Sequence, residues 1–153
     1  MNSNFNNYGL ILLAVTFMLG ALGFKLSLVP FHSWVPDVYE GSTAALAGFL
    51  AIVPKIAAFV VVLRIFEIFI SAGDTYVETA LYIIAVVTMT MGNLMALSQT
   101  DIKRMLAFSS ISHAGFVLAA ILIGTTQATI GIFVYWSLFA IANLGAFGML
   151  WIN

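Results

Sequence analysis

The sequence has no cysteine and very little charge, and both absences exclude classes of function. Without cysteine there can be no thiolate metal site, disulfide or iron–sulfur cluster. Charged residues make up 7% of the 153, against about 25% in a soluble domain. The formal net charge of −1 provides no basic face for nucleic acid. The two histidines and six acidic residues are scattered over different segments, so we expect no metal site either.

Long apolar runs dominate what is present. Hydrophobic residues make up 63% of the sequence and the mean hydropathy is +1.12. Because a helix rises about 1.5 Å per residue, about 20 apolar residues cross a hydrocarbon core of about 30 Å. The runs lack the period-2 alternation of a membrane barrel, and Met1–Asn7 lack the basic residues of a signal peptide. We therefore predict an all-α membrane protein, a single transmembrane domain over residues 1–153 with about five spans. The predicted spans are Tyr8–Val29, Ala44–Ile70, Val77–Leu97, Met105–Ile123 and Ile130–Ile152.

The basic residues between the spans predict the orientation. With five spans, the N-terminal tail and the loops at 71–76 and 124–129 share one side, and their loops carry no lysine or arginine. The opposite side carries Lys103 and Arg104. Because basic loops stay in the cytoplasm, we expect the N-terminus outside and the C-terminus inside the cell.

The first span is predicted to be discontinuous. From Tyr8 to Pro36 it would reach roughly 44 Å as one helix, with Lys25 as its one charge. Pro30 lacks an amide donor and clashes with the preceding turn, so the helix should break near it, and Pro36 repeats the effect six residues later. Broken membrane helices often mark ion sites, because freed carbonyls must line protein or water.

Lys55 is the clearest candidate for chemistry. It lies 11 residues after Ala44 and 15 before Ile70, too far from either end of its helix to reach the interface. A lysine at the membrane centre costs about 2.5–3.5 kcal/mol on insertion scales. One interpretation is a proton carrier, since desolvation favours the neutral amine. The other is a structural lysine bonded to a helix carbonyl, such as that of Leu50, which Pro54 frees.

Lys25 and the two histidines are further candidates. Lys25 precedes the predicted break, although its side chain could also extend to the interface. If it lies roughly 8–10 Å from Lys55, the two charges repel by about 2 kcal/mol, so protonating one would help deprotonate the other. His32 follows the break, and His113 follows serines that include Ser112. An imidazole can pass protons near neutral pH, but each histidine could equally be a packing residue.

The remaining polar residues have simpler interpretations. Arg64 and Glu67 are three apart on one helix, which favours a local ion pair. Asn93 and Asn143 are single polar residues in apolar helices, as expected of bonds between helices. The acidic residues at 37 and 40 follow the second proline of the broken segment. They could gather protons at the cytoplasmic mouth or be solvated loop acids.

Several strings resemble the antiporter-like membrane subunits of respiratory complex I. A lysine followed by P-F-H-x-W-x-P-D is a pattern of that family, and this sequence has KLSLVPFHSWVPD. The strings follow the family's order and cover most of the chain, so the chain is identified as a member. They are Phe24–Ser42, Pro54-Lys55 with Val60–Phe66, Gln99–Phe116 and Asn143–Gly145.

The resemblance implies roles for the candidates. In that family a lysine like Lys25 lies beside a helix break and one like Lys55 lies at the membrane centre, within a chain of buried groups that moves protons. His32, Ser112 and His113 would then lie near the cytoplasmic path by which protons arrive. The family also uses a glutamate on an earlier helix and a lysine on a later broken helix, and this sequence, similar to part of such a subunit, contains neither.

The expected function is part of the proton-pumping membrane arm of NADH:quinone oxidoreductase, which is an enzyme complex. The resemblance implies other membrane subunits as partners, including a neighbouring antiporter-like subunit, besides the lipid bilayer. It places NADH, FMN, iron–sulfur clusters and quinone in other subunits, so no cofactor is expected in this chain. Two alternatives stay open: a subunit of a multisubunit sodium/proton antiporter, and a non-conducting membrane scaffold. The bacterial inner membrane is the favoured location, with thylakoid and mitochondrial inner membranes as alternatives.

Overall fold

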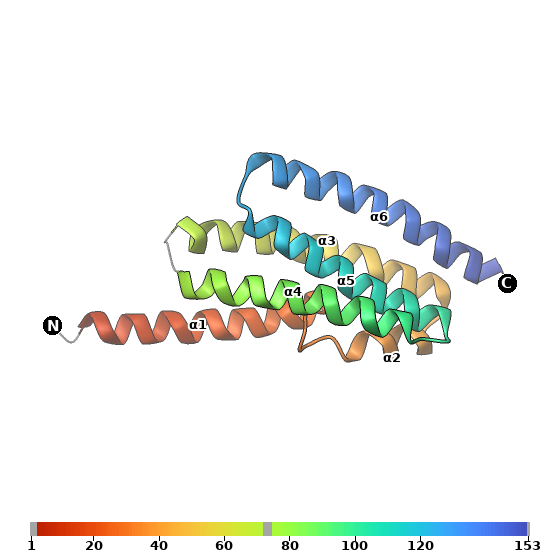
Figure 1. The fold of residues 1–153 in the computed structure, drawn as a ribbon, viewed down its shortest axis with the longest axis horizontal. Coiled ribbons are helices and arrows are strands. Elements are labelled where there is room, and N and C mark those ends of the chain that lie inside the picture. Colours follow the sequence, from red (N-terminus) through yellow and green to blue (C-terminus); the bar gives the residue numbers. More distant parts are fainter. Residues whose placement is uncertain (1–2, 72–74, 153) are drawn as a thin grey trace.

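The computed structural model describes residues 3–71 and 75–152, with side chains at 9–10, 13–65 and 77–152. The described residues form six helices and no strand. Figure 1 shows the long helices running side by side along the longest axis. Helix α1 begins, α3 ends and α5 turns into α6 toward one end, while α2, the α4–α5 turn and the C-terminus lie at the other. The helices are α1 (Ser3–Leu26), α2 (Trp34–Gly41), α3 (Ala44–Ser71), α4 (Thr75–Leu97), α5 (Ile102–Leu122) and α6 (Thr126–Ile152).

Four of these helices are long and apolar enough to cross a membrane, which confirms an all-α membrane fold. The stretches are Ala44–Ile65, Val77–Leu97, Ile102–Leu122 and Thr126–Ile152, and α1 adds the shorter apolar stretch Leu13–Leu26. Helix α5 begins three residues earlier than predicted because the Asp101 side chain caps it by accepting a hydrogen bond from Arg104 N at 3.0 Å.

The first segment is broken, as predicted. Helix α1 ends at Leu26, where Ser27 takes a left-handed backbone conformation (φ +64°) that turns the chain and lets Leu28 N donate to Gly23 O at 2.8 Å. The next amide, Val29 N, donates to the buried Thr88 Oγ1 of α4 at 3.1 Å. A side chain of a neighbouring helix thus replaces the lost intrahelical partner, which makes the break possible inside a membrane.

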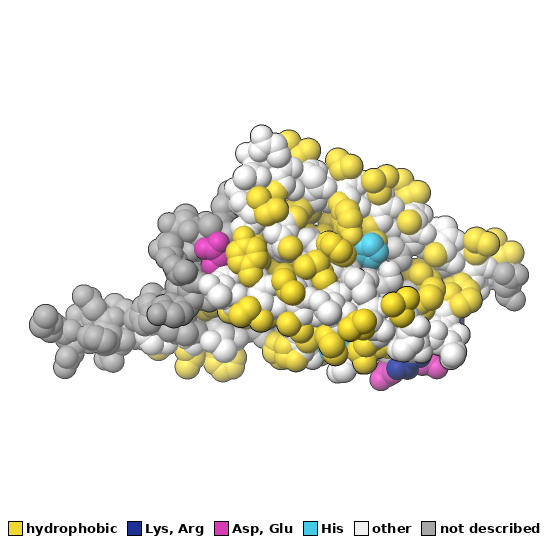
Figure 2. Space-filling view, viewed as in Figure 1, with side chains coloured by type: hydrophobic (Ala, Val, Ile, Leu, Met, Phe, Trp, Pro, Cys, Tyr) yellow, Lys and Arg dark blue, Asp and Glu magenta, His cyan; other side chains and the backbone are white. Residues whose placement is uncertain are grey.

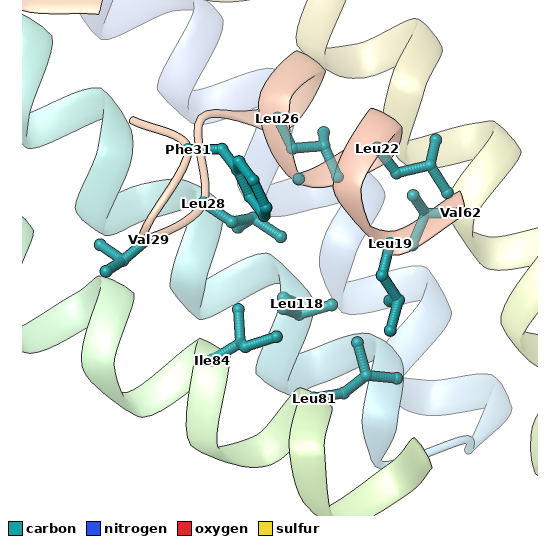
Figure 3. Close-up of a pocket in the computed structure, with 11 residues that line it drawn as sticks. Leu19, Leu22, Leu26, Leu28, Val29, Phe31, Val62, Leu81, Ile84 and Leu118 are labelled. Carbon is teal, nitrogen blue, oxygen red and sulfur yellow. The ribbon is translucent and has the colours of Figure 1, made fainter. Parts of the chain in front are cut away.

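An apolar layer lies between the break and the outer part of the bundle. Figure 3 shows side chains from α1, the break, α3, α4 and α5 meeting around a cavity of about 40 Å³. Because it is small and has no polar partner for water, we expect it to stay dry. The lining side chains shown are Leu19, Leu22, Leu26, Leu28, Val29, Phe31, Val62, Leu81, Ile84 and Leu118.

Two glycines let α4 and α5 approach closely. A Cβ atom at Gly92 would lie 2.7 Å from Ser112 N, and one at Gly115 would lie 2.9 Å from Met89 N. Both contacts are with backbone, which cannot move aside as the end of a side chain can. Small residues at such crossings allow the backbone-to-backbone packing that stabilises membrane helices.

Gly92→Ala should therefore destabilise the bundle. We expect a loss of about 1–3 kcal/mol, the usual range for overpacking, seen as a lower melting temperature by circular dichroism in detergent. Gly145→Ala in α6 is the matched control, because a Cβ there meets nothing within 4 Å and alanine favours a helix. Equal melting temperatures for the two variants would contradict the close approach of α4 and α5.

Candidate functional site

Lys55 is buried at the contact of α3 with α5. Its side chain is 2% exposed, and Nζ donates to Ser110 O at 3.0 Å and to Ser110 Oγ at 2.9 Å. The expected alternative of a bond to the Leu50 carbonyl is wrong, because both acceptors belong to α5. Both are also neutral, and no carboxylate among the described residues pairs with Lys55. An ammonium has three N–H donors, so the third is left without a described protein acceptor.

Ser110 is the site residue that sequence reasoning missed. It is fully buried, and its Oγ donates to Ala107 O at 2.8 Å. Ser112, which the sequence favours, instead lies against α4, where its Oγ donates to Met89 O at 3.4 Å. The run of serines before His113 was a usable signal, since residues three apart share a helix face and place Ser110 with His113.

His113 joins α5 to α6. Its Nδ1 is hydrogen-bonded with the Tyr135 hydroxyl, and its ring lies 4.7 Å from that of Phe139. Burial is partial. The position is close enough to Lys55 for the lysine charge to act on the imidazole. The structure therefore brings three of the chain's polar groups together, Lys55, Ser110 and His113, with Tyr135 at the edge.

The predicted pairing of Lys25 with Lys55 has no counterpart among the described contacts. Lys25 lies in the last turn of α1 with an exposed side chain and no hydrogen bond or ion pair to any described residue. His32 lies in the break, and its Nδ1 is buried without a hydrogen-bond partner in the described part of the chain. Both candidates therefore lie beside the break, on the side of the bundle away from α6.

A group of ion pairs fastens α2 to the start of α5. Arg104 pairs with Asp37 at 2.8 Å and with Glu40 at 2.5 Å. Lys103 Nζ donates to the carbonyls of Glu40 and Ser42, both at 3.1 Å, which satisfies acceptors at the C-terminal end of α2. Figure 2 shows acidic and basic side chains gathered at this end of an otherwise largely apolar face. The predicted solvated acids are thus partners of the residues that the sequence suggested as topology anchors.

The two asparagines do not join helices. Asn143 is buried, but its Nδ2 donates to Phe139 O in its own helix at 2.9 Å, so the expected bond between helices is wrong. Asn93 is exposed on this chain. The side chain of Glu67 lies outside the described residues, so its expected pairing with Arg64 stays a prediction.

Residues 1–152 match the family described as NADH:quinone oxidoreductase/Mrp antiporter, transmembrane. The chain belongs to the NADH:quinone oxidoreductase/Mrp antiporter family. The broken helix, the buried Lys55 and the serine–histidine segment on α5 are therefore features of a family member.

Relatives within this family carry the name NADH-quinone oxidoreductase subunit N. The protein from Sulfurimonas denitrificans is 62% identical over 151 residues, which are 99% of this chain and 30% of that protein. The protein from Helicobacter hepaticus is 61% identical over 144 residues, covering 94% and 29%. These relatives agree with the strings KLSLVPFHSW and VYEGS and with the Pro-Lys pair, which favour subunit N over its two larger relatives.

A solved structure supports the same family. Respiratory complex I from Thermus thermophilus with bound aureothin contains a chain with a TM-score of 0.73 and 37% sequence identity. The match covers 91% of this chain and 30% of that one. The chain thus spans about three-tenths of the length of the relatives that it matches.

Proposed function

We propose that this chain is part of a proton-translocating membrane subunit of NADH:quinone oxidoreductase, of the subunit N type, and that Lys55 carries protons in it. One observation carries the proposal: a lysine is fully buried in a membrane helix with only neutral acceptors around it. A buried charge is very costly unless it is paired or can be neutralised. A lysine without a carboxylate partner can lower that cost by releasing its proton, which is what a carrier does.

The arrangement supports a path from the α2 end of the bundle. Polar groups lie at the level of Lys55 and toward that end, whereas the cavity of Figure 3 is apolar. Protons would thus reach Lys55 from the side of α2, with His32 and His113 as possible stations. Lys25, exposed on this chain, would use a partner from a part of the subunit outside this sequence.

The complete subunit would act with other membrane subunits of the complex in the bacterial inner membrane. NADH, FMN, iron–sulfur clusters and quinone would be bound by those other subunits. We favour this assembly over a sodium/proton antiporter because the relatives above carry the name of the oxidoreductase.

Deleting the coding region of this chain distinguishes the two assemblies. Loss of NADH-driven proton uptake, with inhibited NADH oxidation, is the expected result. Normal NADH oxidation with impaired sodium export would instead identify an antiporter subunit and overturn the proposal.

The proposed orientation places the N-terminus outside the cytoplasm. The motive is the basic pair Lys103–Arg104 at the α2 end. Because this chain has no cysteine of its own, Thr125→Cys in the α5–α6 turn should react with an impermeant thiol reagent added from outside. Ser98→Cys, at the opposite end, is the control and should react only after the membrane is opened. The reverse pattern of labelling would overturn the orientation.

A further inference from the structure

Tyr39 is a buried residue of α2 to which the sequence gave no role. It is 1% exposed and lies in an apolar cluster with Ala47 and Ala51 of α3 and Ala107 and Ile111 of α5. Its ring also makes an edge contact with Phe147 of α6, with centroids 6.2 Å apart. A phenolic hydroxyl in such surroundings needs a hydrogen-bond partner, and the Tyr39 side chain has one in Ser110.

The hydrogen-bonding capacity of Ser110 then assigns the direction of each bond. A serine hydroxyl has one donor and two acceptor positions. Its proton is used on Ala107 O, and one acceptor position takes Lys55 Nζ. Tyr39 must therefore donate to the remaining position. Burial raises the pKa of Tyr39 to about 12, so the phenol keeps its proton at physiological pH and can act as that donor.

We propose that Tyr39 is a positioning residue for Lys55 that acts through the Ser110 hydroxyl. The proposal rests on the proposed function of Lys55. Two donors share one oxygen, so the bond from Tyr39 weakens the acceptor that stabilises the protonated lysine and eases release of its proton. Because Arg104 and Lys103 fasten α2 to α5, the position of this hydroxyl also depends on the ion pairs at the end of the bundle.

The charged and titratable groups around Lys55 allow a pH measurement to be interpreted. Tyr39 faces it from α2 and His113 from α5, with Tyr135 of α6 beyond His113. Lys25 of α1 has no described contact with it. Removing the Tyr39 hydroxyl leaves all the other groups in place.

The test is Tyr39→Phe in the complete complex, with proton pumping in vesicles measured against pH and normalised to assembled complex. Without the competing donor, Ser110 holds the protonated lysine more tightly, so we expect lower pumping at neutral pH and a pH optimum displaced to more alkaline values. Tyr82→Phe is the matched control. Its hydroxyl also donates within the bundle, to Leu122 O at 3.2 Å, but it does not contact Ser110, so its pH profile should equal that of the wild type.

A second comparison tests the route through Ser110. Since Ser110→Ala already removes the shared oxygen, adding Tyr39→Phe to it should change the pH profile no further. A wild-type profile for Tyr39→Phe, or a further displacement in the double variant, would overturn the proposal. Full pumping by Lys55→Met would instead overturn the proposed function, so the two failures are distinguishable.

Discussion

Complexes that carry Lys55→Arg are expected to assemble and yet to lose the proton transfer that runs through this chain. Arginine keeps the positive charge, but its pKa above about 12 means that it effectively never releases a proton. Positioned proton-transfer groups typically contribute about 10²–10⁴-fold to a rate, so this transfer should fall by at least about tenfold. The measurement is NADH-driven proton uptake by vesicles, expressed per assembled complex.

Lys103→Arg is the matched control for this exchange of side chains. Lys103 also donates two hydrogen bonds, but to carbonyl groups at the end of α2, and in the proposed mechanism it does not need to release its proton. Its variant should pump as the wild type does. Wild-type pumping by Lys55→Arg would show that charge alone is needed at position 55, and the carrier role would be lost.

Lys25→Met is expected to have the second-largest effect. Lys25 lies beside the break, exposed on this chain and without a described partner, which suits a group that exchanges protons with the rest of the subunit. Its loss should slow pumping by at least about tenfold through this chain, again on the scale of a missing transfer group, with normal assembly.

Lys103→Met provides the comparison for Lys25→Met. It removes a lysine of the α2–α5 fastening and leaves the proposed path intact, so it should lower assembly more than pumping per assembled complex. If Lys25→Met pumps like the wild type, Lys25 merely extends to the interface, and the proposed coupling of the two lysines fails.

The break and the buried lysine could be predicted because each conflicts with its surroundings in the sequence alone. Pro30 lacks a donor wherever it stands in a helix, and Lys55 is far from both ends of an apolar run whatever the tertiary structure is. Neither inference needs to know which helices are neighbours. The structure confirms the break and the burial.

The partners could not be predicted in this way. Helix α5 is apolar or small on all sides, so its sequence gives no periodic signal for the face toward α3. Ser110 and Ser112 were thus equivalent candidates until packing placed one against Lys55 and the other against α4. The bonds of Arg104 to Asp37 and Glu40 span more than sixty positions, and only the folding of α2 onto α5 reveals them.

The central claim is that the Lys55 amine binds and releases a proton during turnover. The most direct measurement is the number of protons pumped per NADH oxidised by assembled Lys55→Met complexes in sealed vesicles. Methionine has a similar length and cannot bind a proton, and Ser110 keeps its bond to Ala107 O, so no buried donor is left unsatisfied by the change. The account predicts a ratio clearly below that of the wild type at a normal amount of complex. An unchanged ratio at normal assembly would contradict it and would identify Lys55 as part of a scaffold.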